Sequence, residues 1–311
     1  MKMKKPVFCL GLTPALQRTV LVSNLTLGEV NRTRQVMESA GGKMVNTARA
    51  LATLGNEVMV AGFNGGDTGR RILECLKVYG VENQFTEMRK MTRTCTTLLD
   101  QQSGSVTEIV EEAPPIELPD VKKMSLHCSS LIPKSSVLVI AGTLPSYVSD
   151  HFYIKFAEDA QRAKVPLVID SHGTAILHTL STRPLLAKMS VMELGITFGC
   201  KMTSDEKIAA GMKELFDRGA RNVLITADKL GIDSHGIGRK LYAQFIVKPA
   251  VDVQVWRIRV PVGRVRVIDT VFFPSRVPAR RFDRMKKPGR FQIFRIIRPY
   301  ILAVGRQPLE Q

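Results

Sequence analysis

Short runs of β-branched residues alternate with amphipathic helical stretches from residue 1 to about residue 250, and this alternation restricts the possible folds strongly. Strands that alternate with helices along the chain are typical of a mostly parallel sheet covered by helices, the α/β class. The strands are expected near residues 6–12, 57–63, 136–142, 165–170, 184–189 and 221–226.

Two amphipathic stretches predict helices with recognisable ends. The first covers residues 67–80, where Asp67 or Thr68 can act as the N-cap and Gly80 can end the helix. The second covers residues 205–218. Both carry apolar residues at three- and four-residue intervals, so each is expected to pack one face on the sheet.

Two other segments do not follow the strand-helix alternation. Residues 17–38 and 92–113 contain β-like patches, and the second has a Ser-Gly turn between two runs. We expect these strands to leave the main sheet and form a small β lid. The sequence therefore predicts one domain over residues 1–250, with a segment of different character over residues 251–311.

Composition excludes several classes of protein. A chain of 311 residues with 44% hydrophobic content can bury a globular core. No apolar run approaches the roughly 20 residues that cross a bilayer, so no membrane span is expected. The basic start with its short apolar run predicts a first strand rather than a signal peptide. Five scattered cysteines without a Cys-x-x-Cys pair indicate reduced thiols in a cytoplasmic protein.

The positive charge is concentrated at the C-terminal end. Residues 251–311 hold twelve arginines and two lysines against four acidic residues, which is +10 of the formal net charge of +17. Six prolines also interrupt this segment. Because arginines here alternate with aromatic residues, one alternative is a surface that binds RNA or single-stranded DNA.

The stretch SAGGKMVNTARALATLG, residues 39–55, is the most informative for chemistry. Gly41 and Gly42 open a helix, and Lys43 and Asn46 lie on its first turn. Glycines let a ligand approach the backbone, and a helix start presents unpaired N–H groups. The stretch suits a polyhydroxy or phosphorylated ligand. An ordinary glycine turn before a structural helix is the alternative.

Residues 41–69, GGKMVNTARALATLGNEVMVAGFNGGDTG, resemble the N-terminal signature of the ribokinase-like PfkB carbohydrate kinases. Residues 12–32 and 142–153 resemble segments of the phosphosugar branch, which contains 1-phosphofructokinases and tagatose-6-phosphate kinases, and residues 223–231 resemble its nucleotide-side strand. The resemblance implies a three-layer α/β sandwich and transfer of a phosphoryl group from ATP, with Mg²⁺, to a hexose or hexose phosphate. It also implies a homodimer through the lid.

The resemblance also implies residue roles on the sugar side. Gly41, Gly42, Lys43 and Asn46 match the sugar-binding motif, Arg93 matches an arginine that contacts the acceptor phosphate, and Glu111 matches a lid glutamate. An arginine has the planar fork of donors that suits a phosphate. A solvated residue at a strand edge is the other interpretation of Arg93.

On the nucleotide side, Lys188 and Glu193 match the family's KPNxxEL stretch, and Thr226 and Gly231 match positions that hold the nucleotide. The match is incomplete, because KPN is replaced by Lys-Met-Ser at residues 188–190. On the sugar side, the family's NPALD has become TPALQ at residues 13–17. No protein residue is predicted to bind a metal by itself.

The family's catalytic GxGD segment is not found. Residues 260–263 resemble its start, but Arg264, Val265 and Arg266 follow, and the nearest carboxylate, Asp269, is displaced by several residues. Our hypothesis is that a change of reading frame replaced residues 251–311 with unrelated sequence. The alternatives are the nucleic-acid tail described above and a charged edge strand formed by the alternating arginines and valines.

Overall fold

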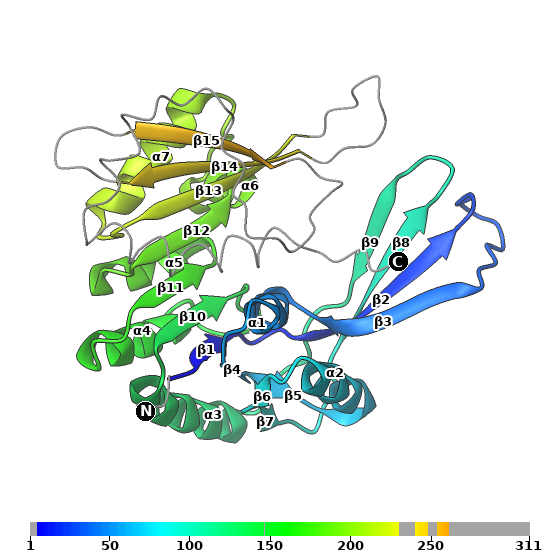
Figure 1. The fold of residues 1–311 in the computed structure, drawn as a ribbon, viewed down its shortest axis with the longest axis horizontal. Helices are drawn as coiled ribbons and strands as arrows, with labels where there is room; N and C mark the ends of the chain where they lie inside the picture. The colour runs from blue at the N-terminus through cyan, green and yellow to red at the C-terminus, as the bar shows by residue number, and fades with distance from the viewer. Residues whose placement is uncertain (1–4, 146, 230–239, 248–253, 261–311) are drawn as a thin grey trace.

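The computed structural model describes residues 5–145, 147–229, 240–247 and 254–260. Within them, a main sheet has nine strands in the order β15-β14-β13-β12-β11-β10-β1-β4-β6 (Figure 1). These are β1 Val7–Leu10, β4 Val58–Ala61, β6 Glu82–Asn83, β10 Val137–Ala141, β11 Leu167–Asp170, β12 Leu186–Ser190, β13 Val223–Lys229, β14 Lys240–Val247 and β15 Gln254–Val260. All neighbours from β13 to β6 are parallel, and only β14 and β15 are antiparallel, which confirms the α/β class.

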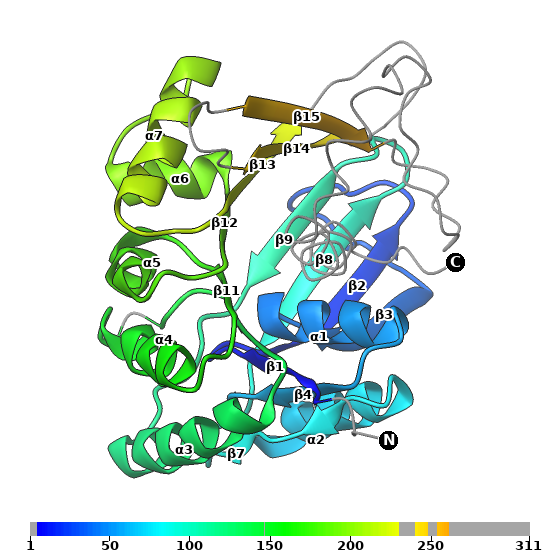
Figure 2. The same ribbon diagram turned by 60° about the vertical axis from the view of Figure 1, so that its left-hand side comes forward.

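Helices cover the sheet in layers. They are α1 Lys43–Thr53, α2 Gly66–Val78, α3 Leu118–Leu131, α4 Phe152–Arg162, α5 Gly173–Thr179, α6 Val191–Phe198 and α7 Asp205–Asp217, with 3₁₀ turns η1 Ile132–Lys134 and η2 Leu180–Thr182. Figures 1 and 2 show α3, α4 and α5 on one face, with α6 and α7 continuing that layer, while α1 lies on the other face. No helix in the described ranges is long and apolar enough to cross a membrane; the cytoplasmic location stays a prediction.

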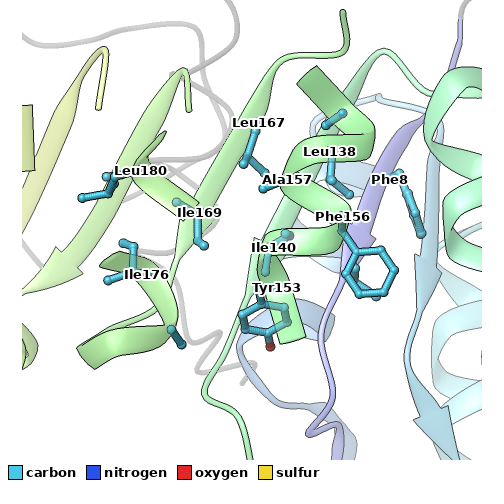
Figure 3. Packing of buried hydrophobic residues seen from close by; sticks show 14 of the residues in the cluster. Phe8, Leu138, Ile140, Tyr153, Phe156, Ala157, Leu167, Ile169, Ile176 and Leu180 are labelled. Atoms are coloured by element: carbon cyan, nitrogen blue, oxygen red, sulfur yellow. The ribbon is translucent and has the colours of Figure 1, made fainter. Parts of the chain in front are cut away.

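Both faces of the parallel strands are buried, which explains their continuous apolar runs. In β10, Leu138 and Ile140 belong to the core beneath α4, whereas Val137 and Val139 belong to the core on the α1 side. Figure 3 shows Tyr153 and Phe156 of α4 lying over this part of the sheet. A side chain such as Phe156, fully enclosed here, stabilises the fold by about 3–5 kcal/mol relative to alanine.

All six predicted strands and both predicted helices are present, but the predicted N-cap of α2 is wrong. The cap position is Gly65, and no side chain caps this helix. Asp67 lies inside the first turn and accepts from Arg70 at 2.5 Å, while the Thr68 hydroxyl donates to the Thr92 carbonyl at 2.5 Å. Because Asp67 bonds to Arg70 and Thr68 bonds to Thr92, neither side chain caps the helix. Gly80, at φ 65°, follows the helix end as expected.

The predicted lid is a separate four-stranded sheet in the order β3-β2-β8-β9. Its strands are β2 Ala15–Val22, β3 Gln35–Gly41, β8 Thr94–Asp100 and β9 Val106–Val110, and the short pair β5 Phe63–Asn64 and β7 Thr86–Glu87 lies apart from it. Figure 2 shows the lid rising from the carboxyl side of the main sheet beside α1. The first residue of α1 directly follows the strand β3 and Gly42, so the lid leads straight into the start of this helix.

The C-terminal segment enters the described structure only as far as Val260. Residues 254–260 form β15, the edge strand of the main sheet, paired antiparallel with β14. The arginines that alternate with Ile258 and Val260 at 257–260 therefore lie in the outermost described strand, as the edge-strand interpretation expects for this part of the stretch. The tail after residue 260, with Asp269, lies outside the described residues, and so does Gly231. The reading-frame hypothesis, the nucleic-acid alternative and the domain boundary at residue 250 therefore stay predictions.

Candidate functional site

A buried ion pair lies where two neighbouring parallel strands end. Asp170 is the last residue of β11, and Lys188 faces it from β12 in register. The Lys188 ammonium lies 3.0 Å from the Asp170 carboxylate, and the two side chains are only 5% and 1% exposed. Removing one partner of such a pair leaves an uncompensated buried charge and costs about 3–5 kcal/mol. The pair is thus a rigid polar end to an otherwise apolar sheet.

Lys43 joins this pair from the opposite layer. As the first residue of α1, it places its ammonium 3.4 Å from Asp170 and in contact with the Glu193 carboxylate. Burial lowers the pKa of Lys43, but the charges of Asp170 and Glu193 raise it more, so the net shift is upward. Two ammonium groups and two carboxylates therefore form one chain of charges, which we call the charge cluster (Lys43, Asp170, Lys188, Glu193).

Glu193 is oriented by the start of its own helix. It occupies the third position of α6, where its carboxylate accepts from the Ser190 backbone N–H at 2.7 Å. The Ser190 hydroxyl in turn accepts from the Glu193 N–H at 3.2 Å, which completes a capping box. Burial raises the pKa of Glu193, but the charge and hydrogen bond of Lys43 outweigh it and lower the pKa to about 2. The side chain is a fixed anion at neutral pH.

Position 42 requires glycine because the backbone at Thr13, after β1, lies directly against it. Its φ of 94° lies in the region that favours glycine, and a Cβ there would come within 2.7 Å of the Thr13 carbonyl oxygen. The segment after β1 therefore lies directly against the start of α1. This contact brings Lys43 to the end of β11.

Arg93 and Glu111 form a second group at the base of the lid. The Arg93 guanidinium donates to the Glu111 carbonyl at 2.9 Å and to the Thr13 carbonyl at 3.2 Å, and the Thr94 N–H donates to the Glu111 carboxylate at 2.8 Å. Its Nε is buried and has no partner within the part of the chain that the structure describes. Arg93 thus connects the lid to the loop after β1, and its buried Nε–H is an unused donor.

The remaining predicted residues that the structure describes lie next to these two groups along the chain or across the sheets. Asn46 follows Lys43 by three residues on α1 and is half-buried, and Thr226 in β13 is the register partner of Ser190 in β12. Gln17, which stands where the family has an acid, donates to the Thr97 hydroxyl at 2.8 Å within the lid. Gly41 pairs with Ala15 in the same sheet.

Asp170 and Ser171 have a part in the site that the sequence analysis missed. Asp170 links Lys43 to Lys188, and the Ser171 hydroxyl beside it is buried without a hydrogen-bond partner among the described residues. The available signal was a carboxylate and a hydroxyl directly after a buried strand, in the DSHG stretch at 170–173. Side chains at such a strand end commonly face a ligand crevice.

Residues 4–253 match the family described as pfkB family carbohydrate kinase. The chain belongs to this family. Tagatose-6-phosphate kinase of Staphylococcus epidermidis is 29% identical over 203 residues, which are 65% of this chain and 65% of that protein. The match therefore spans less than two thirds of that relative's length.

Solved structures share the fold of this pfkB family chain. Phosphofructokinase-2 of Escherichia coli, in complex with fructose-6-phosphate, superposes with a TM-score of 0.67 at 22% identity over 80% of this chain and 82% of that chain. A Thermotoga maritima protein named as a possible 1-phosphofructokinase gives a TM-score of 0.66 at 17% identity, covering 78% of each chain. The predicted family and the ribokinase-like α/β fold are confirmed.

Proposed function

We propose that this pfkB family chain transfers a phosphoryl group from ATP to a hexose or hexose phosphate. The observation that carries the proposal is the charge cluster. It links Lys43, expected on the sugar side, to Lys188 and Glu193, expected on the nucleotide side. Phosphoryl transfer depends chiefly on positioning the two substrates and on neutralising the developing charge. A charge cluster that joins the sugar side to the nucleotide side is suited to positioning the two substrates and to neutralising charge.

The sugar would lie between the base of the lid and the start of α1. Gly41, Gly42, Lys43 and Asn46 line the helix start, while Arg93 and Glu111 lie at the lid base. We infer that the unused Nε–H of Arg93 contacts a phosphate on the acceptor, because a half-buried guanidinium with a free donor is a strong partner for an anion. This assignment favours a sugar phosphate over a free sugar.

The nucleotide would lie along the ends of β12 and β13, near Lys188, Glu193 and Thr226, and Gly231 is proposed to complete this side. Among the described residues no group of three or more His, Cys, Asp or Glu side chains could enclose a metal ion by itself. The carboxylates of Asp170 and Glu193 are nevertheless the ligand type that Mg²⁺ accepts when it also binds substrate phosphates. Bound there with ATP, Mg²⁺ would neutralise phosphate charge.

Taking the proton from the acceptor hydroxyl needs a carboxylate that the charge cluster does not offer. Asp170 contacts two lysines and Glu193 contacts one, so neither carboxylate is free to take up the proton of a substrate hydroxyl. We expect the base beyond residue 260, where Asp269 is the nearest carboxylate in sequence. If a changed reading frame has replaced this segment, turnover by the chain falls far below that of an intact relative.

The test is sugar-dependent release of ADP from MgATP, with tagatose 6-phosphate, fructose 1-phosphate and fructose 6-phosphate as acceptors. A chimera takes its segment after residue 250 from the S. epidermidis kinase. We expect it to turn over rapidly, to lose that turnover with Lys43→Met, and to keep it with the exposed control Lys122→Met. A folded chimera that releases no ADP with any acceptor refutes the proposed function. Rapid turnover by the unaltered chain refutes only the lost-segment hypothesis.

We also propose that the chain forms a homodimer through the lid. Apolar side chains are exposed on its outer strands, at Val36 and Met37 of β3 and Val106, Ile109 and Val110 of β9. Exposed apolar patches of this kind mark interaction surfaces. A tetrameric form is known for E. coli phosphofructokinase-2. Sedimentation of the chain should show a dimer, and Ile109→Glu should dissociate it. The matched control Val78→Glu, at an exposed position of α2, should leave the dimer intact. A dimer that persists in Ile109→Glu contradicts the lid interface.

A further inference from the structure

A basic groove lies at the end of the main sheet opposite the charge cluster. It has a volume of about 480 Å³ and is lined by the end of α4, the turn η2 and the segments that lead into β11 and β13. Leu167, on its floor, is the first residue of β11, whereas Asp170 of the charge cluster is the last. Three residue steps at about 3.3 Å each separate the two by about 10 Å. The groove is therefore a different place from the candidate site.

Among the described residues that line this groove, three side chains are cationic and none is acidic. They are Lys164 after α4, Arg183 after η2 and Arg221 before β13. Within the described structure, none of the three has an ion-pair partner. Two other arginines at nearby helix ends are paired: Arg162 at the end of α4 with Asp159, and Arg218 directly after α7 with Glu214. The groove thus gathers positive charge that the fold leaves uncompensated.

Lys164 and Arg183 also have unusual backbone conformations. They are the two non-glycine residues with positive φ in the described chain, at 56° and 58°. Each follows a helical segment, at a position where glycine is favoured because it has no Cβ. Keeping a long cation at such a position is unfavourable for the backbone, and outliers of this kind cluster at ligand-binding places. Both outliers of the described chain line one groove.

The floor of the groove differs from its rim. Ala157, Pro166 and Leu167 provide apolar surface; Figure 3 shows Ala157 on α4 and Leu167 on β11. Gln161 donates to the Thr182 carbonyl at 3.3 Å, which connects α4 to η2 across the groove. A cationic rim above a small apolar floor fits an anion that carries a compact carbon skeleton.

We propose that this groove binds a small organic phosphate, with the phosphoryl group between Arg183, Arg221 and Lys164 and the carbon part on the floor. Guanidinium groups hold phosphate oxygens through paired, charge-assisted hydrogen bonds. The volume is in the range of small-molecule sites. Because the groove meets the amino ends of β11 and β12, its occupant lies one short strand away from Asp170 and Lys188. The proposal does not depend on kinase activity.

Phenyl phosphate is the probe, since it joins a phosphoryl group to an apolar ring and is not a sugar. Calorimetric titration of the full chain should show binding that is tighter than that of inorganic phosphate and weakens with salt. The variant Arg183→Gln/Arg221→Gln should bind at least tenfold more weakly. The control Lys122→Gln/Lys123→Gln, at exposed positions of α3, removes the same charge elsewhere, and its affinity for phenyl phosphate should stay within twofold of the unaltered chain.

Arg183→Gly excludes misfolding as the cause of a loss. Glycine suits φ 58°, so this variant should unfold at a urea concentration equal to or above that of the unaltered chain and still bind more weakly. Three results overturn the proposal: unchanged binding by Arg183→Gln/Arg221→Gln, an equal loss in the Lys122/Lys123 control, or loss of binding in Arg93→Met. The last result places the phosphate at the base of the lid.

Discussion

Replacing Glu193 with glutamine tests the charge cluster most directly. The substitution keeps the shape of the side chain, and glutamine at the third helix position can still accept from the Ser190 N–H in a capping box. It removes the negative charge that faces Lys43. The change therefore isolates the ion pair from the helix cap.

The expected magnitude follows from the pKa of Glu193. A fall from 4.5 to about 2 corresponds to about 3 kcal/mol of preference for the charged form in the folded state. Because the folded pKa is lower than the unfolded pKa, this stabilisation is fully present above pH 4.5 and is lost as the pH falls toward 2. Lys43 keeps Asp170 as a partner in the variant, so the loss should be about 2–3 kcal/mol at pH 7.

The assay is urea unfolding followed by circular dichroism, for the unaltered chain and Glu193→Gln, between pH 7 and pH 3. The two unfolding free energies should differ by a constant amount above pH 4.5 and converge below it. Glu214→Gln breaks an exposed pair with Arg218 and serves as the control, with a loss below about 1 kcal/mol. Equal stability of Glu193→Gln and the unaltered chain at pH 7, or a difference that grows on acidification, refutes the reasoning.

Three further perturbations follow from single contacts. Gly42→Ala should lower the free energy of unfolding in urea by at least about 2 kcal/mol, because the new Cβ meets the Thr13 carbonyl oxygen. Gly55→Ala has open space around its Cβ and should lose only the backbone strain at φ 80°, about 1–2 kcal/mol. Equal losses in the two variants would rule out the steric argument. Phe156→Ala should lower the free energy of unfolding by about 3–5 kcal/mol, and a loss below 1 kcal/mol contradicts the packing beneath α4. In an active chimera, Arg93→Met should raise KM for a sugar phosphate at least tenfold without a matching rise for MgATP; equal rises in both contradict an acceptor-side role.

The strands and most helices were predictable because each depends on a local pattern. A run such as VLVIA in β10 is apolar at every position, and this is what burial on both faces requires. The helix α7 begins at Asp205 with the Ser204 hydroxyl accepting from the Lys207 N–H, which is also a local signal. The N-cap of α2 failed because Thr68 donates to Thr92, a residue 24 positions away that no local pattern identifies.

The candidate site was only partly predictable. The residue types of Lys43, Arg93, Lys188 and Glu193 were identified through the family resemblance, each on its own motif. Their arrangement was not, because Lys43 and Glu193 are 150 residues apart and meet only when α1 lies across the end of β11. Asp170, which links Lys43 to Lys188, was not identified from the sequence.

The sequence by itself determined the alternation of strands and helices, the family and the types of side chain near each strand end, since these follow from short-range periodicity and motif. Tertiary structure decided which charges meet. The parallel sheet brings Asp170 and Lys188 side by side, and the contact between Gly42 and Thr13 brings Lys43 to them. The same packing places Lys164, Arg183 and Arg221 around one groove, where none of them has an ion-pair partner among the described residues. Ion pairing depends on separation in space, which packing sets.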